Sequence, residues 1–409
     1  MNNEKLLQRF ISYTKVNTQS NPNSTTIPST KEQKDLAKIL KNQLQEMNLI
    51  VKEDSNGYLV ATLKSNLDYK VDKIGFVAHI DTSSDYSGEN VKAIIHRNYN
   101  GQDIVFKTGE VMSVERFNEL KKYQNQTLIT SDGTTLLGGD DKAGIAIIME
   151  MLEYYSNNKA ILHGDIIVAF TFDEEIGSGI DNFDLEYFKP DYAYTVDGGE
   201  IGELNYETFN AASLKVEIQG LNVHPGSAKN KMINSLEKAY EFHSMLPKAD
   251  KPELTDNYQG FYMLTNMSGD VEKSILEYII RDHNSDIFEY RKKYIYQIVE
   301  QMKKEQKDLQ IEVTIKDQYY NMAIPILKNP KCVEIAKKAF IKNDITPNIK
   351  AIRGGTDGSK LSYDGILCPN IFTGGNNFHG RFEFTVLESM AKARDIIIDI
   401  VKIVSKQID

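Results

Sequence analysis

Hydrophobic and polar residues follow two different patterns along this chain, and the change between them divides the sequence. Up to about residue 208, helical patterns alternate with short, mainly apolar runs, of which the clearest are 74–78, 165–171 and 192–196. Continuous apolar runs of this length are typical of strands that are buried on both faces of a sheet. The first part of the chain is therefore predicted to be α/β, beginning with an amphipathic helix over 3–15.

The second pattern occupies the middle of the chain, where residues 211–219 alternate between apolar and polar side chains. The periodicity predicts further strands at 260–266, 274–281 and 311–315, and helices at 231–245 and 285–306. This order of elements favours an antiparallel sheet with helices on one face. We therefore predict an inserted α+β domain over 209–320.

After the insertion the α/β pattern returns. It predicts helices at 331–342 and 385–405 and short strands at 349–352 and 370–373. The larger domain would then comprise residues 1–208 and 321–409. We expect it to hold a mostly parallel or mixed sheet that is covered by helices.

Imidazole and carboxylate side chains follow the predicted buried strands. The run that ends at Ala78 continues into His79 and Asp81, the next buried strand is followed by Glu174 and Glu175, and Asp197 follows the run 192–196. In open α/β sheets, ligands bind at the carboxyl ends of the strands. A neutral imidazole and a carboxylate two residues apart suit a metal site, where the Asp either ligates the metal or orients the His. The alternative is a loop histidine capped by a nearby aspartate.

Two further segments carry similar chemistry. Residues 136–144 read LLGGDDKAG and lead into an apolar helix, so the glycines allow close backbone approach and the acids lie at a helix N-terminus. The alternative is an ordinary Asp N-cap on a buried helix. His379 lies in the stretch GGNNFHG, directly after an apolar strand.

Taken together, two imidazoles and three carboxylates are expected at strand ends of one sheet: His79, Asp140, Glu175, Asp197 and His379. Ligands of these types suit zinc, cobalt or manganese. Five protein ligands exceed the needs of one catalytic zinc, but they suffice for two metals if one carboxylate bridges them.

Composition narrows the classes of partner. The formal net charge of −10 argues against a general affinity for nucleic acid or anionic membranes. No run approaches the roughly 18 apolar residues of a membrane helix, and the N-terminus lacks the apolar core of a signal peptide. The two cysteines, Cys332 and Cys368, form no CxxC motif. We expect a cytoplasmic protein that keeps its thiols reduced.

The motifs resemble those of the M20 metallopeptidases, and within them the tripeptide aminopeptidases. The matching stretches span nearly the whole chain in the family's order: VAHIDT (77–82), LLGGDDKAG (136–144), FTFDEEIG (170–177), TVDGG (195–199), NVHPGSAK (222–229), IRGGTDGS (352–359) and GGNNFHGRFEF (374–384). Small departures, such as Gly139, spare every polar position.

The resemblance implies two zinc ions per subunit, with cobalt or manganese as substitutes. His79 and Asp197 would hold one ion, Glu175 and His379 the other, and Asp140 would bridge them. The choice of Asp140 over Asp141 comes from the family's pattern alone.

The resemblance also implies roles for residues beside the metals. Glu174 would be the general base, and Asp81 would hold His79 in the correct tautomer. His224 in the inserted domain would stabilise the oxyanion of the tetrahedral intermediate. Arg281 and Arg353 would anchor a peptide carboxylate or carbonyl, although a salt bridge on the sheet rim is the alternative for each.

The activity that the resemblance implies is removal of the N-terminal residue from tripeptides, with the inserted domain acting as a lid in a monomer or homodimer. A dipeptidase, a carboxypeptidase or an acyl-amino-acid deacylase would use the same metal ligands. A non-catalytic peptide- or metal-binding protein is a further alternative. The presence of Glu174 argues against it, because a binding protein has no use for a general base.

Overall fold

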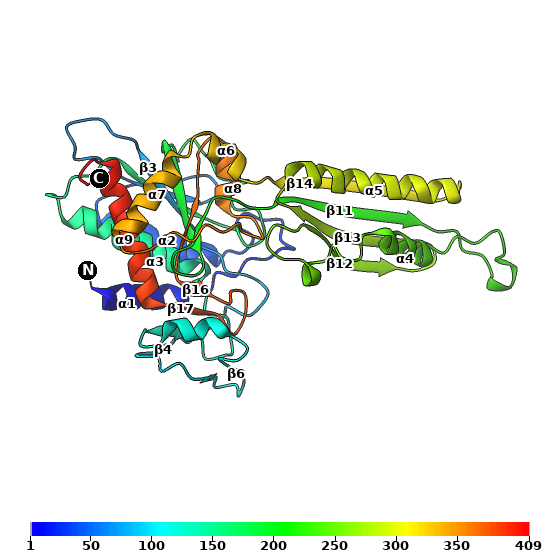
Figure 1. The fold of residues 1–409 in the computed structure, drawn as a ribbon, viewed down its shortest axis with the longest axis horizontal. Helices are drawn as coiled ribbons and strands as arrows, with labels where there is room; N and C mark the ends of the chain where they lie inside the picture. The colour runs from blue at the N-terminus through cyan, green and yellow to red at the C-terminus, as the bar shows by residue number, and fades with distance from the viewer. Residues whose placement is uncertain (1, 409) are drawn as a thin grey trace. The chain divides into compact units, whose positions relative to one another are not determined.

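The computed structural model describes residues 2–408, which divide into two compact units. The first unit comprises the chain up to Tyr206, Ile324–Lys350 and the chain from Thr356 onward. The second comprises Glu207–Ala323 and the short segment Ala351–Gly355. Figure 1 shows the course of the chain through both.

A seven-stranded mixed sheet forms the centre of the first unit, in the order β1-β2-β8-β3-β9-β15-β10. Its strands are β1 (Ile50–Glu53), β2 (Leu59–Leu63), β3 (Ile74–His79), β8 (Ile166–Thr171), β9 (Tyr192–Gly198), β10 (Leu204–Asn205) and β15 (Asn370–Phe372). The central strands β8, β3, β9 and β15 run parallel, and β1, β2 and β10 pair antiparallel at the edges. Every residue of β3 and β8 is buried, as continuous apolar runs predict.

Helices cover this sheet. They are α1 (Asn3–Thr14), α2 (Gln33–Glu46), α3 (Gly139–Asn157), α6 (Ala323–Lys328), α7 (Lys331–Lys342), α8 (Asp357–Tyr363) and α9 (Leu387–Val404). The almost wholly buried α3 packs across β3 and β9, and α1 and α9 pack on α3. Thr30 and Gln33 have the spacing that predicts a capping box at the start of α2, but the box is not formed. The N-cap residue is Glu32, which makes no side-chain capping bond, and the Gln33 amide donates to Asp173 instead.

A second, antiparallel sheet in the first unit corrects one expectation. It has the order β16-β17-β7-β4 and consists of β4 (Ile94–His96), β7 (Leu128–Thr130), β16 (Gly375–Asn376) and β17 (Phe384–Val386). Asp140 and His379 follow β7 and β16, so the candidate ligands do not all follow strands of one sheet. A small hairpin of β5 (Ile104–Val105) and β6 (Val111–Met112) and a 3-10 helix at Asn118–Tyr123 complete residues 82–127.

The predicted strand at 349–352 is also wrong. The Ile352 N–H donates to the Glu207 carbonyl, which draws this segment into the second unit. Just before this segment, in the first unit, Asn348 forms an isolated β-bridge with Glu203.

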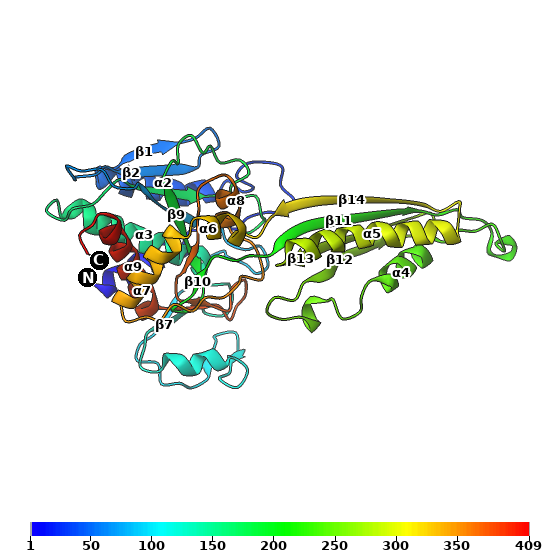
Figure 2. The same ribbon diagram turned by 45° about the horizontal axis from the view of Figure 1, so that its top comes forward.

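The second unit is built on an antiparallel sheet in the order β12-β13-β11-β14 (Figure 2). Its elements are β11 (Asn210–Gln219), α4 (Ser235–Met245), β12 (Phe261–Gly269), β13 (Lys273–Asp282), α5 (Ser285–Glu305) and β14 (Gln310–Tyr319), with 3-10 turns at Pro225–Ser227 and Pro252–Leu254. Both α4 and α5 pack on β13 and on each other, so they share one face. Together with the mixed sheet of the first unit, this confirms the predicted fold class.

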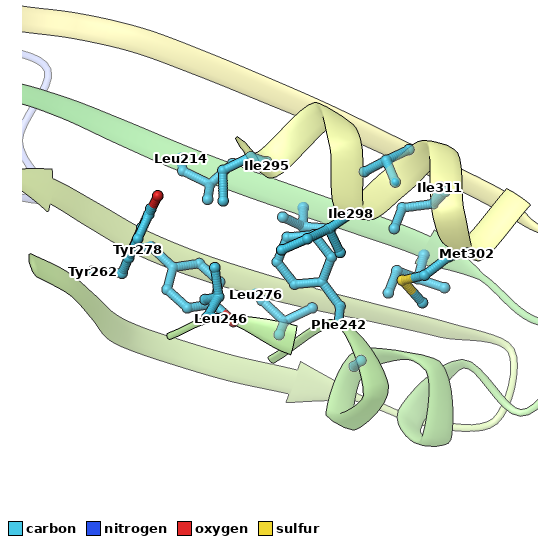
Figure 3. Packing of buried hydrophobic residues seen from close by; sticks show 14 of the residues in the cluster. Leu214, Phe242, Leu246, Tyr262, Leu276, Tyr278, Ile295, Ile298, Met302 and Ile311 are labelled. Atoms are coloured by element: carbon cyan, nitrogen blue, oxygen red, sulfur yellow. The ribbon is translucent and has the colours of Figure 1, made fainter. Parts of the chain in front are cut away.

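The inward-facing side chains of this second sheet form its core with the two helices (Figure 3). Leu276 from β13, Phe242 from α4, and Ile298 and Met302 from α5 are almost completely buried there. Among the helices between residues 2 and 408, none is both long enough and apolar enough to cross a membrane.

Replacing Leu276 by Ala should lower the free energy of unfolding by about 2–5 kcal/mol, because the substitution leaves a cavity between β13 and the helices. Urea unfolding followed by circular dichroism measures the change. The matched control is Leu254→Ala, since Leu254 is 62% exposed and its truncation should change the stability little. Equal effects of the two substitutions would contradict the assignment of this core.

Candidate metal centre

His79 ends β3 and is nearly inaccessible to solvent. Its Nε2 atom lies 2.9 Å from Asp140 Oδ1 and 3.6 Å from Asp197 Oδ1. Its Nδ1 atom faces the Asp81 carbonyl oxygen at 3.0 Å and the Asp81 carboxylate at 3.4 Å. Burial opposes the positive charge on this ring, but the hydrogen bonds to Asp140 and Asp197 outweigh burial and hold the pKa of His79 well above its ordinary value.

The Asp81 carboxylate lies behind the ring and also connects two strand ends. Its two oxygens accept the backbone N–H groups of Glu174 at 3.0 Å and of Glu175 at 3.2 Å. The residue therefore joins the end of β3 to the segment that follows β8. Such a partner fixes the orientation of an imidazole ligand.

Asp140 lies between the two imidazoles. Besides its contact with His79, its Oδ2 atom lies 3.4 Å from His379 Nε2. The neighbouring Asp141 instead accepts the backbone N–H groups of His79 and Gly144. Burial raises the pKa of Asp140, but hydrogen bonds from both histidines prevail and lower it. Asp140 is thus the carboxylate that faces both rings.

Glu175 and His379 meet on the other side of Asp140. Glu175 Oε2 lies 2.9 Å from His379 Nε2, and the Nδ1 atom of this ring lies 3.3 Å from Asp85. The hydrogen bond to Asp140 is the main cause that raises the pKa of His379 to about 11. Burial raises the pKa of Glu175 and of Asp197 to about 7.

These residues suit a cation. Ligand atoms of His79, Asp140 and Glu175 lie within 4.8 Å of one another, as do those of His79, Asp141 and Asp197. Glu175 Oε1 is buried and has no hydrogen-bond partner among the described residues. An unpartnered buried carboxylate oxygen is costly, and a metal ion would supply the missing partner.

Glu174 lies at the same strand end but outside both groups of ligand atoms. Burial raises the pKa of its carboxyl well above the ordinary value. A raised pKa makes this carboxylate easier to protonate, which suits a group that accepts a proton during a reaction.

The remaining predicted site residues belong to the second unit. His224 is exposed, and its Nδ1 atom accepts the Gly226 N–H at 3.1 Å. Arg281 donates to the carbonyls of Ala212 and Ile280 and lies over the Tyr319 ring. Arg353 donates to three backbone carbonyls and the Thr255 hydroxyl, and its guanidinium lies over two phenylalanine rings. The alternative for both arginines was a salt bridge on the rim of the sheet. Among the contacts of residues 2–408, neither of them forms one.

Sequence reasoning missed several residues that support the ligands. Asn370 accepts the Asp197 backbone N–H at 3.1 Å, and the Thr356 hydroxyl lies 3.4 Å from the Asp197 carboxylate. Glu383 accepts backbone N–H groups from the segment that leads to Asp140, and Lys142 is buried beside the same segment. Burial lowers the pKa of Lys142 to about 7. The local sequence gave no signal for these roles, although Thr356, Lys142 and Glu383 lie within recognised motifs.

Comparison with known proteins identifies similar families. A model described as the peptidase dimerisation domain matches residues 206–310, and one described as M42 glutamyl aminopeptidase matches 102–223. A protein of Caldanaerobacter subterraneus subsp. tengcongensis named peptidase T is 49% identical over 406 residues, covering 98% of this chain and 99% of its own. A Clostridium perfringens protein of the same name is 50% identical over 405 residues, covering 99% and 100%.

Solved structures share the fold. A tripeptidase from Staphylococcus aureus superposes with a TM-score of 0.80 at 24% identity, covering 100% of both chains. A dinuclear metal binding peptidase from the M20 family, from Bacillus subtilis, superposes with a TM-score of 0.67 at 13% identity, covering 99% of both chains.

Metal binding at pH 7 should release protons, because ligands must be deprotonated to bind, the pKa of His379 is raised to about 11 and the pKa of His79 is raised as well. The apparent affinity should therefore increase as the pH rises through 7, where Glu175 and Asp197 also lose protons. Calorimetric titration of the metal-free protein with Zn²⁺, in buffers of different ionisation enthalpy, measures the number released. We expect about one proton or more per chain.

The matched control is His243→Asn, which removes an imidazole that contacts Tyr278 in the second unit and should leave proton release unchanged. A binding enthalpy independent of the buffer would contradict the assigned protonation states.

Proposed function

Because this chain belongs to the peptidase T family of M20 metallopeptidases, we propose that it is a metallo-aminopeptidase that removes the N-terminal residue from tripeptides. The observation that carries the proposal is the position of Asp140, whose two oxygens face His79 and His379 at 2.9 and 3.4 Å. One carboxylate between two imidazoles suits a pair of metal ions that share a ligand.

Two zinc ions fit this donor set, and cobalt or manganese would suit the same ligands. His79 and Asp197 would hold one ion, Glu175 and His379 the other, and Asp140 would contact both. When bound, the two ions would polarise the scissile carbonyl and lower the pKa of the attacking water.

The protein's own groups would then move the protons. Glu174 would take a proton from the attacking water and deliver it to the leaving amine. The raised pKa of Glu174 supports this role, since burial makes its carboxylate a better proton acceptor. Asp81 would keep the imidazole of His79 oriented through the contacts at Nδ1.

The second unit would complete the site as a lid over the first unit, which carries the metals. Because the Nδ1 atom of His224 accepts the Gly226 N–H, the neutral ring carries its proton on Nε2. That N–H is a suitable donor to an oxyanion. We assign Arg281 and Arg353 to binding of the peptide's carboxylate or carbonyl, since a guanidinium fork matches a carboxylate.

Two further features concern assembly and location. The match of residues 206–310 to a dimerisation domain favours a homodimer over a monomer. Cys332 and Cys368 are both buried and free, which suits the reducing cytoplasm.

Hydrolysis of a tripeptide panel, with the N-terminal amine free or acetylated, tests the proposed function. The enzyme should release only the first residue, lose activity on acetylation and on chelation, and regain it with Zn²⁺. Cleavage of acetylated peptides would instead support a deacylase or carboxypeptidase with the same metal ligands. Binding without hydrolysis would support the non-catalytic alternative.

Replacing Glu174 by Gln should lower kcat by about 10²–10⁴-fold, because the amide cannot accept the proton of the attacking water. Steady-state kinetics with a tripeptide measure the loss, and metal analysis should find the same metal content as in the native enzyme. Glu186→Gln is the matched control, since the Glu186 side chain is 79% exposed and pairs only locally with Lys189. A variant at position 174 with native kcat would remove the residue from the mechanism.

A further inference from the structure

The Glu383 carboxylate accepts four consecutive backbone N–H groups. Its Oε2 atom lies 2.8 Å from the nitrogen of Leu137 and 2.9 Å from that of Gly138. Its Oε1 atom lies 2.6 Å from the nitrogen of Gly139 and 3.2 Å from that of Asp140. The side chain is 1% exposed, so these bonds are shielded from water. A buried carboxylate holding four backbone donors is a strong local constraint.

The bonded segment needs such a partner. The first N–H groups of a helix have no acceptor within the helix. Here the backbone of Asp140 and Asp141 departs from helical angles, and Gly138 has a φ of +76° that favours glycine. The conformation that presents Asp140 is therefore not one that α3 maintains by itself, and Glu383 is the group that satisfies the donors.

The contact leaves no space for a larger residue at 139. A Cβ atom added to Gly139 would lie 2.4 Å from Thr385 Oγ1 and 3.1 Å from Glu383 Oε1. Glycine at 139 thus fits the close approach of the 383–385 segment. The side chain of Lys142 is buried beside this segment, where its Nζ atom donates to the Val16 carbonyl.

We propose that Glu383 is a positioning residue of the metal centre, which holds residues 137–140 so that the Asp140 carboxylate faces both histidines. The inference rests on the proposed two-metal function, because it concerns the ligand shared by the two ions. Glu383 itself would contact neither ion. Its removal would weaken the shared ligand and leave the separate ligands of each ion in place.

Glu383→Gln tests this role with little change in size. The amide has one oxygen, so two of the four N–H groups lose their acceptor and face an NH₂ group instead. Loss of a group that supports a metal ligand commonly lowers metal affinity by about 10–100-fold. We expect the affinity for the more weakly bound of the two ions to fall by this factor.

The measurement is titration of the metal-free, full-length protein with Co²⁺. Visible absorption reports the coordination of the bound ion, and a competing chelator sets the affinity scale. Asp54→Asn is the matched control. Asp54 also accepts four backbone N–H groups, from Asn56, Gly57, Tyr58 and Asp184, but it does so at the β1–β2 turn. Glu383→Gln should lose Co²⁺ affinity, whereas Asp54→Asn should bind Co²⁺ as the native protein does.

The outcomes separate this inference from the proposed function. A native protein that binds fewer than two Co²⁺ ions would overturn the function, and the inference with it. If the native protein binds two and Glu383→Gln binds both with native affinity and spectrum, only the inference is overturned. If Glu383→Gln does not fold, Gly139→Ala tests the inference instead. Its added methyl group would push residues 137–140 away from the 383–385 segment while Glu383 remains. That variant must also bind the weaker ion less tightly, or the inference fails.

Discussion

The concentration of buried carboxylates around two imidazoles is the constraint on which the rest of this structure depends. Isolated ionised groups are very costly to bury, so each must find a charge or a hydrogen-bond partner. Here the Asp140 carboxylate contacts two histidines, and the Asp81 carboxylate accepts two backbone N–H groups. Among residues 2–408, one oxygen of Glu175 has no hydrogen-bond partner. Such a cluster stays in place only if the backbone beneath it is rigid, which the fully buried strands β3 and β8 provide.

Much of this arrangement was predictable from local sequence. Continuous apolar runs identified β3, β8 and β9, and the polar residues directly after them fall at their carboxyl ends. The motif order then pointed to a family, which the near 50% identity of full-length relatives established. These successes share one cause, since each feature is encoded within about ten neighbouring residues.

What was missed depends on contacts between distant segments. Asp140 was expected at a strand end of the large sheet, but the preceding strand, β7, pairs with β4 and β17 and so belongs to the smaller sheet. Gln33 fits a capping box, yet its amide bonds to Asp173, 140 residues away. The predicted strand at 349–352 failed because Ile352 pairs with Glu207. Periodicity describes which face of an element is apolar, and it does not describe which distant segment supplies the partner.

The supporting residues show why a ligand set alone does not define a metal centre. Asp81 and Glu383 both use carboxylate oxygens to hold the backbone of segments that carry proposed ligands. A bond to the backbone constrains where a ligand's Cα lies, whereas a bond to the side chain only turns it. Control of the backbone position matters for Asp140, because its carboxylate faces His79 and His379 at once and has only two side-chain torsions to adjust. The carboxylates that bind peptide N–H groups are then as much part of the centre as those that face the histidines.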